Sequence, residues 1–249
     1  MQRNDSVTSR RRFVKGFTIG MAALATTPGL FAEALEKKRI PTVATTEGPF
    51  YPDRMPLDTD NDLLIINDAI TPAVGEITHV TGRVLSATAQ PVRNAFVEIW
   101  QVDSTASYIH SRGRQPTGND SHFQGYGRFL TDAQGQYYFR TIKPISYTLI
   151  GAFRTAHIHF AISKNGKRVF TTQLLVRGLE TNARDSVVKS ITDPKALETI
   201  LVDFKRLPGS KIGELSANFD IVLGRTIEEL EDGRLRGGIG RSEIQNRPK

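Results

Sequence analysis

The sequence predicts an all-β fold, an antiparallel sandwich or barrel with a few short helices and long loops. Three observations predict it. Short runs of β-branched and aromatic residues recur from Thr78 onward, turn residues separate them, and few helical stretches intervene. The 249 residues, 39% hydrophobic and 24% charged, are enough for one soluble globular domain with a substantial core.

An export signal is predicted over residues 1–34. SRRRFVK at residues 9–15 precedes the apolar, charge-free run 16–32 and the small-x-small triplet Ala32-Glu33-Ala34. The paired arginines resemble the bacterial twin-arginine motif, whose pathway moves folded proteins. A generic secretory signal or a short membrane anchor is the alternative, but an apolar run of about 17 residues that Thr-Thr-Pro interrupts is short for a span. We expect an exported, periplasmic protein with no stable membrane span in its mature form.

An extended N-terminal arm is predicted over residues 35–77. PTVATTEGPFYPDRMPLDTDND is rich in Pro, Thr and Asp and shows neither helical nor strand periodicity. The predicted β-domain follows over residues 78–224. A turn at Asp132–Gly135 precedes the strand QYYFRTI, and a turn at Asn165-Gly166 joins HIHFAIS to RVFTTQLLV. The expected strand segments are THVTGRVL, NAFVEIWQ, QYYFRTI, HIHFAIS, RVFTTQLLV and NFDIVL.

Two short helices are also predicted. One covers Pro194–Lys205, with Asp193 as N-cap and proline at the first helical position. The other begins after Thr226 and ends at Gly233. Thr226 and Glu229 form a capping-box pattern at its start. The tail 225–249 has little to bury, and we expect it to be loosely ordered.

Net charge and cysteine content limit which ligands the protein could bind. The net charge of +7 is partly carried by the predicted signal, and the mature chain has no basic block interleaved with aromatic residues, so nucleic-acid binding is not expected. The chain has no cysteine, which rules out disulfides and thiolate ligands. A metal would have to be bound through nitrogen and oxygen.

The segment RTAHIHF, residues 154–160, contains two of the five histidines of the chain. On a strand, His157 and His159 point to the same face, about 6.6 Å apart along the chain, while Ile158 and Phe160 point to the other. The pair could hold a metal or simply be polar residues on a solvated face. Zinc, copper and non-haem iron sites all use this H-x-H spacing.

A complete metal site needs further ligands. His79, His110, His122 and Asp120 are available, but their surroundings are more typical of loops. The alternatives are two tyrosines at strand-to-loop junctions, Tyr108 in WQVDSTASYIH and Tyr147 in TIKPISY.

Several segments, in order, resemble the intradiol ring-cleavage dioxygenases, and within that family the iron-binding (beta) chains of the protocatechuate 3,4-dioxygenases. The segments are EGPFYPD, VRNAFVEIWQVDSTASYIH, FQGYGRFLTDAQGQYYFRTIKPISY, RTAHIHF and TTQLLV. The resemblance implies a prealbumin-like, mainly antiparallel β-sandwich. It also implies Fe(III) bound by Tyr108, Tyr147, His157 and His159, with Arg154 and Gln173 at the same site.

The implied activity is oxidative ring opening of a small catechol-type substrate. O2 would cleave the ring between its two hydroxylated carbons to give a cis,cis-muconate-type diacid, with Tyr147 leaving its place to the substrate and Arg154 stabilising developing negative charge. A phenol of pKa about 10 loses its proton on binding a trivalent cation, so two tyrosinates suit Fe(III). The family often forms multiple or mixed assemblies, so a homo- or hetero-oligomer is implied.

Alternatives to this enzyme remain open at the level of the sequence. The same sandwich could be an exported prealbumin-like binding module without catalysis, or could hold a copper or zinc hydrolase-like site. Leu149 stands where protocatechuate enzymes carry a tryptophan near the substrate, so catechol, hydroxyquinol or a larger catechol is open as substrate.

Overall fold

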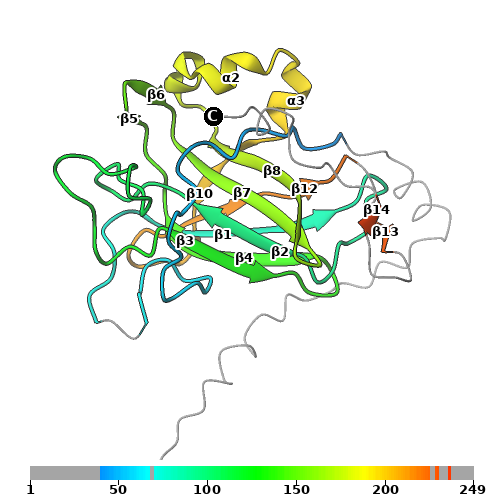
Figure 1. Cartoon of the computed structure of the whole chain (residues 1–249), viewed down its shortest axis with the longest axis horizontal. Helices are drawn as coiled ribbons and strands as arrows, with labels where there is room; N and C mark the ends of the chain where they lie inside the picture. Colours follow the sequence, from blue (N-terminus) through cyan, green and yellow to red (C-terminus); the bar gives the residue numbers. More distant parts are fainter. Residues whose placement is uncertain (1–39, 68–69, 225–227, 230–234, 237–249) are drawn as a thin grey trace, which may run out of the picture. The chain divides into compact units, whose positions relative to one another are not determined.

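The structure is a computed structural model, and it describes residues 40–67, 70–224, 228–229 and 235–236. The chain divides into two units, Met1–Lys37 and Lys38–Lys249. The first unit, with the predicted signal, lies outside the described residues. The second contains two five-stranded sheets, and Figure 1 shows short helices at one end of them.

The first sheet is built around β1 (Ile77–Leu85). β1 pairs antiparallel with β4 and parallel with β11 and β12, and β10 pairs antiparallel with β11. Its other strands are β4 (Gln136–Ile142), β10 (Phe204–Arg206), β11 (Leu215–Asn218) and β12 (Ile221–Val222).

The second sheet has the order β3-β2-β7-β8-β9 and carries the two neighbouring histidines on β7. Its pairs are antiparallel except for β8 with β9. The strands are β2 (Phe96–Trp100), β3 (Tyr126–Leu130), β7 (His157–Lys164), β8 (Lys167–Val176) and β9 (Leu201–Val202). Two small antiparallel pairs complete the strands: β5 (Tyr147–Leu149) with β6 (Ala152–Arg154), and β13 (Glu228–Glu229) with β14 (Leu235–Arg236).

The main core lies between the two sheets. Alternate residues of β7, among them Ile158 and Phe160, are fully buried in it. The Phe160 ring contacts Tyr137 of β4 and Phe219 between β11 and β12, with ring centroids 5.9 and 5.1 Å apart. Because His157 and His159 occupy the other face of β7 and are also buried, the second sheet is covered on both faces.

The predicted all-β sandwich is confirmed, and five of the six strand segments match single strands. The segment NFDIVL instead divides into β11 and β12. Between them Phe219 accepts a hydrogen bond from the Tyr137 hydroxyl and donates its backbone N–H to Thr81. The Asp220 carboxylate pairs with Arg83. The segment NFDIVL therefore does not form one continuous strand, because the contacts of Phe219 and Asp220 interrupt its pairing with β1 between β11 and β12.

The helix predictions need correction. The structure has η2 (Glu180–Arg184), α2 (Ser186–Ser190) and α3 (Pro194–Glu198). Asp193 caps α3 as predicted, but the helix ends at Glu198 because the following residues pair with β8 and β11 as β9 and β10. The predicted helix after Thr226 is wrong at Glu229, which lies in β13; Thr226 and Gly233 lie outside the described residues. Within the described residues, no helix is both long and apolar enough to cross a bilayer.

Candidate metal centre

The candidate site lies on the outer face of the second sheet, opposite the main core. Three residues in cross-strand register form its floor, because Trp100 of β2 and Gln173 of β8 both pair with His159 of β7. The Trp100 indole stacks on the His159 ring, with centroids 4.7 Å apart and planes 6° from parallel. The imidazole is therefore fixed in orientation by packing against a fully buried aromatic side chain.

Four side chains that the sequence predicts as ligands converge above this floor. The Tyr108 hydroxyl lies 2.8 Å from the Tyr147 hydroxyl, 3.3 Å from His157 Nε2 and 3.1 Å from His159 Nε2. The two Nε2 atoms are 3.1 Å from each other. Four donor atoms from three separate regions of the chain thus meet at one point, and we call this group the tyrosine–histidine cluster.

The histidines of the cluster are neutral bases. His157 Nδ1 lies 2.6 Å from the Thr155 carbonyl oxygen, so Nδ1 carries the proton and the Nε2 lone pair faces the cluster. Burial, followed by the positive charge of Arg154, lowers the pKa of His157 to about 3. Burial and the neighbouring His157 hold the pKa of His159 well below its usual range. His157 Nε2 therefore presents a lone pair to the cluster, and a neutral His159 can present one through its Nε2 as well, which suits a bound cation.

The phenols of the cluster are protonated unless a cation binds. Burial raises the pKa of Tyr108 well above its usual value, and the neighbouring Tyr147 adds to the rise. Burial also raises the pKa of Tyr147, although the Tyr108 hydroxyl and Arg154 oppose it. A metal ion supplies the charge that makes such phenols ionise. The donor set of two phenols and two neutral imidazoles therefore fits a hard, highly charged cation.

The hairpin β5–β6 couples a predicted ligand to the predicted site arginine. Tyr147 and Arg154 are directly opposite in its register, and only the two-residue turn Ile150-Gly151 joins the strands. The short segment TLIGAF thus brings the arginine close to the phenol. The buried side chain of Leu149 packs in the same apolar group as Tyr147, at the position where the family resemblance places a tryptophan.

Arg154 is held by two side chains from different elements. Its Nε donates to Asp185 Oδ2 at 2.9 Å, and its Nη2 donates to Gln173 Oε1 at 2.7 Å. Gln173 in turn donates through Nε2 to the Thr46 carbonyl of the arm. Both predicted non-ligand residues, Arg154 and Gln173, therefore lie at the cluster, and Gln173 links the arginine to the N-terminal arm.

The N-terminal arm covers the cluster. Gly48, at φ +73°, lies against His159, because a Cβ at this glycine would stand 3.3 Å from His159 Cε1. The Phe50 ring stacks on Tyr108 at 5.2 Å. Further along, Arg168 of β8 ion-pairs with both Glu47 of the arm and Glu98 of β2. A partly buried ion-pair network thus fastens the arm to the sheet beside the site.

Several of these contributors were not predicted as site residues. Asp185, Trp100, Gly48 and Glu98 have no recognisable site motif around them. Weak signals exist nevertheless: Trp100 is the single tryptophan of the chain, and Glu98 is a lone carboxylate inside an apolar strand. Of the remaining histidines, His79 bonds to Tyr138 and Glu214, and the His110 ring meets Phe50 edge-on.

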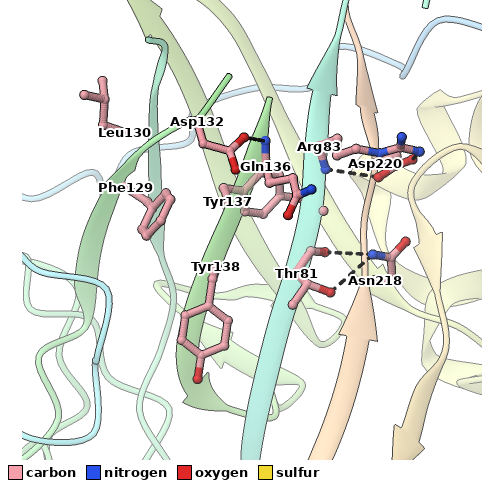
Figure 2. Close-up of a pocket in the computed structure, with 11 residues that line it drawn as sticks. Thr81, Arg83, Phe129, Leu130, Asp132, Gln136, Tyr137, Tyr138, Asn218 and Asp220 are labelled. Atoms are coloured by element: carbon pink, nitrogen blue, oxygen red, sulfur yellow. Dashed lines mark hydrogen bonds and ion pairs between the residues drawn. The ribbon is translucent and has the colours of Figure 1, made fainter. Parts of the chain in front are cut away.

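A hollow of about 590 Å³ lies over the first sheet (Figure 2). Its polar side chains largely satisfy one another: Arg83 pairs with Asp220, and Asn218 bonds to Thr81. None of the six predicted site residues lines it. The chemistry predicted from the sequence therefore belongs to the cluster on the second sheet and not to this hollow.

Comparison with known proteins agrees with this architecture. A family model described as Dioxygenase matches residues 46–224. The chain belongs to the intradiol ring-cleavage dioxygenases. It is 37% identical over 165 residues to the protocatechuate 3,4-dioxygenase beta chain of Burkholderia cepacia, covering 64% of this chain and 69% of that one. The sequence-based family prediction is confirmed.

Other relatives share the same region. The catechol 1,2-dioxygenase 2 of Acinetobacter lwoffii is 31% identical over 55% of this chain, and the chain spans only about half of that relative, 52%. The dioxygenase domain of a dioxygenase carbohydrate-binding protein fusion from Streptomyces sp. SirexAA-E superposes with a TM-score of 0.54. It is 26% identical, and the match covers 75% of this chain and all of that domain. The family is thus an enzyme family, and its intradiol dioxygenase fold is the sandwich described above.

Proposed function

We propose that this protein is a non-haem Fe(III)-dependent intradiol dioxygenase that cleaves a catechol-type ring between its two hydroxylated carbons. Both atoms of O2 would enter the product, a cis,cis-muconate-type diacid. The observation that carries the proposal is the convergence of two phenols and two neutral imidazoles within 2.8–3.3 Å. Among the described residues no group of three or more His, Cys, Asp or Glu side chains could hold a metal, so the phenols are needed to complete a ligand set.

Tyr108, Tyr147, His157 and His159 would hold the iron. When bound, Fe(III) supplies the Lewis acidity that withdraws electron density from a catecholate and makes its ring reactive toward O2. The two phenolates would offset much of the ferric charge, and hard anionic oxygen ligands favour the ferric state. All four side chains are buried, so the iron they would hold would be shielded from bulk water.

Tyr147 would accept a proton from the substrate, and Arg154 would stabilise negative charge on it. Tyr147, which lies on the short β5–β6 hairpin opposite Arg154, would be the phenol that gives way to substrate and accepts a proton from a catechol hydroxyl. Arg154, opposite it in the hairpin, would stabilise negative charge on the ring as it opens. Gln173 would keep the guanidinium in place through its bond to Nη2.

The substrate class follows from the side chain of Leu149 beside Tyr147 and from the relatives. Named relatives act on protocatechuate, catechol and hydroxyquinol. The aliphatic Leu149 beside Tyr147 leaves more room than a tryptophan would at that position. We therefore infer a small catechol as substrate, without restriction to protocatechuate.

Metal analysis, a visible spectrum and O2 uptake on catechol, protocatechuate and hydroxyquinol test the proposal. We expect bound iron, an intense tyrosinate-to-iron charge-transfer band and O2 consumption with at least one substrate. Tyr147→Phe should shift that band, whereas Tyr138→Phe, whose hydroxyl bonds to His79 away from the cluster, should leave it unchanged. A colourless zinc protein would contradict the proposal, and an iron-free protein that binds catechols without O2 uptake would favour a binding module.

We also propose export to the periplasm by the twin-arginine route and assembly as an oligomer. Export rests on SRRRFVK and the apolar run that follows, all outside the described residues. Replacing Arg10, Arg11 and Arg12 together by lysine should abolish appearance of the protein in the periplasm. Light scattering of the purified mature chain would give its assembly state.

A further inference from the structure

Asp185 is a fully buried carboxylate in the segment between η2 and α2. Both of its oxygens are used. Oδ1 accepts the backbone N–H groups of Val187 and Val188, at 2.8 and 3.2 Å, and so caps α2. Oδ2 accepts the backbone N–H of Thr155 at 2.8 Å and Arg154 Nε at 2.9 Å. Four donors from two separate segments therefore meet on one side chain.

Capping alone does not explain why this residue is a buried anion. Asp193 caps α3, a helix of the same length, from an exposed position, and its side chain accepts only the Lys195 N–H, at 2.9 Å. Serine, threonine or asparagine caps a helix about as well without carrying charge. Burying a carboxylate is costly unless it is paired. The partner that offsets this cost at Asp185 is the guanidinium of Arg154.

The contact with Asp185 determines how Arg154 faces the cluster. A guanidinium is planar, so its orientation is set once two of its nitrogens are fixed. Asp185 accepts from Nε and Gln173 accepts from Nη2, so two nitrogens of the same guanidinium are fixed by two different residues. Without the first contact, the long side chain regains rotamer freedom that Gln173 alone does not remove.

We propose that Asp185 is a positioning residue for Arg154, holding its guanidinium toward the tyrosine–histidine cluster and tying that orientation to the turn that begins α2. The proposal rests on the proposed function, since it assigns Arg154 to the catechol reaction. The hydrogen bonds of Asp185 go to Arg154, Thr155, Val187 and Val188, and none goes to the cluster. Asp185 acts through Arg154.

The kinetic test is a double-mutant cycle on the iron-loaded protein. Asp185→Asn should keep iron and colour but lower kcat by about tenfold to a hundredfold, the scale of loss that a small misplacement causes. In an Arg154→Ala background the same change should cost nothing further, because the residue through which it acts is gone. The matched control is Asp193→Asn, which alters the cap of α3 and should leave kcat unchanged.

A second readout needs neither iron nor activity. In the iron-free protein, the Arg154 Nε–H should exchange with solvent about tenfold or more slowly than that of Arg177, whose Nε pairs with Asp203 at the surface. Asp185→Asn should abolish this protection and Asp193→Asn should not. If Asp185→Asn does not fold, Asp185→Ser keeps a capping oxygen while removing the charge.

The results separate failure of this inference from failure of the proposed function. Three results would overturn the positioning role. The first is a cycle in which Asp185→Asn lowers kcat by the same factor with and without Arg154. The others are loss of iron in Asp185→Asn and an Arg154 Nε–H that exchanges as fast as that of Arg177. A parent protein that cleaves no catechol would overturn the proposed function and the kinetic role with it. In that case a protected Arg154 Nε–H would still show that the pairing itself exists.

Discussion

Arg154 carries the positive charge nearest the tyrosine–histidine cluster, and its effect reaches every member. The charge of Arg154 opposes the rise in pKa of both phenols and adds to the fall in pKa of both imidazoles. A fixed cation in a buried site stabilises negative charge far more than it would in water.

Arg154→Ala should therefore slow turnover by about a hundredfold while iron content stays the same, because the arginine is not a ligand. Steady-state kinetics and metal analysis on the same preparation would measure this. The control is Arg177→Ala, which removes an exposed ion pair with Glu198 and should change neither quantity. Loss of iron in Arg154→Ala would show that the arginine is structural.

Gly48 makes a second prediction at the scale of one residue. It combines a positive φ of +73° with close approach to His159. Gly48→Ala should lower the free energy of unfolding by about 1–2 kcal/mol from backbone strain and, in addition, weaken iron binding by displacing the imidazole. Gly178→Ala is a matched control, because Gly178 has φ +78° and open space around its Cβ position. Equal iron retention in the two variants would contradict the contact.

At the scale of elements, two hairpins share the same turn geometry but have different residues at the first turn position. Asn165-Gly166 joins β7 to β8 with φ of +49° and +70°, and Ile150-Gly151 joins β5 to β6 with φ of +49° and +73°. Positive φ at both residues is the mark of a type I′ turn, which favours Asn-Gly. A β-branched residue in this region is strained. The exposed Ile150 is therefore an unfavourable residue at the tip of the hairpin that carries Tyr147 and Arg154.

Ile150→Asn should stabilise the protein by about 0.5–1 kcal/mol, since it relieves that strain and removes an exposed apolar side chain. Urea denaturation of the iron-free protein would measure it. The reciprocal change Asn165→Ile should destabilise the β7–β8 hairpin. A destabilised Ile150→Asn would mean that the isoleucine makes a contact worth more than the turn strain.

Some strands could be predicted from sequence patterns and others could not. Long alternating strands such as β4 and β7 could be predicted because their periodicity reflects burial on one or both faces. β9 and β10 could not, because Leu201–Val202 and Phe204–Arg206 are short and follow a genuine helix start at Asp193. Only pairing with β8 and β11, distant in the sequence, makes these residues strands.

At the scale of the whole molecule, Glu98 connects parts of the fold that are far apart in the chain. Its carboxylate accepts hydrogen bonds from Tyr51 of the arm at 2.6 Å and Tyr126 of β3 at 2.7 Å, and pairs with Arg168 of β8. Burial alone would raise the pKa of Glu98, but the Tyr51 hydrogen bond and the charge of Arg168 outweigh it and hold the pKa below 4.5.

This pairing should make stability depend on pH in acid. Between the folded pKa of Glu98 and its usual value of 4.5, the unfolded chain binds more protons, so the free energy of unfolding rises with pH. The contribution of Glu98 is present above pH 4.5 and is lost as pH falls through the folded pKa, by at most about 1.4 kcal/mol per pH unit. Glu98→Gln should therefore differ from the parent most at neutral pH and least near pH 3.

Urea denaturation of the iron-free proteins from pH 3 to 7 would measure that convergence. Glu198→Gln, which removes an exposed carboxylate paired with Arg177, should change the pH dependence little because exposed pairs are screened. A constant difference between the parent and Glu98→Gln across this range would show that Glu98 contributes through packing and not through its charge.

The sequence by itself determined the all-β class, the family and the residue types of the candidate site. Strand alternation is a local property, and the spacing of His157 and His159 already places both on one face of a strand. Tyr108, Tyr147, Arg154 and Gln173 could be added only because their surrounding segments resemble those of a known family.

The tertiary structure decided how those residues meet and what holds them. The pairing of β2, β7 and β8 places Trp100 and Gln173 beside His159, and the α2 cap places Asp185 on Arg154. Such contacts join residues from different strands and helices, and no local periodicity encodes them. They arise because buried polar groups must find partners wherever the packed sheets bring them.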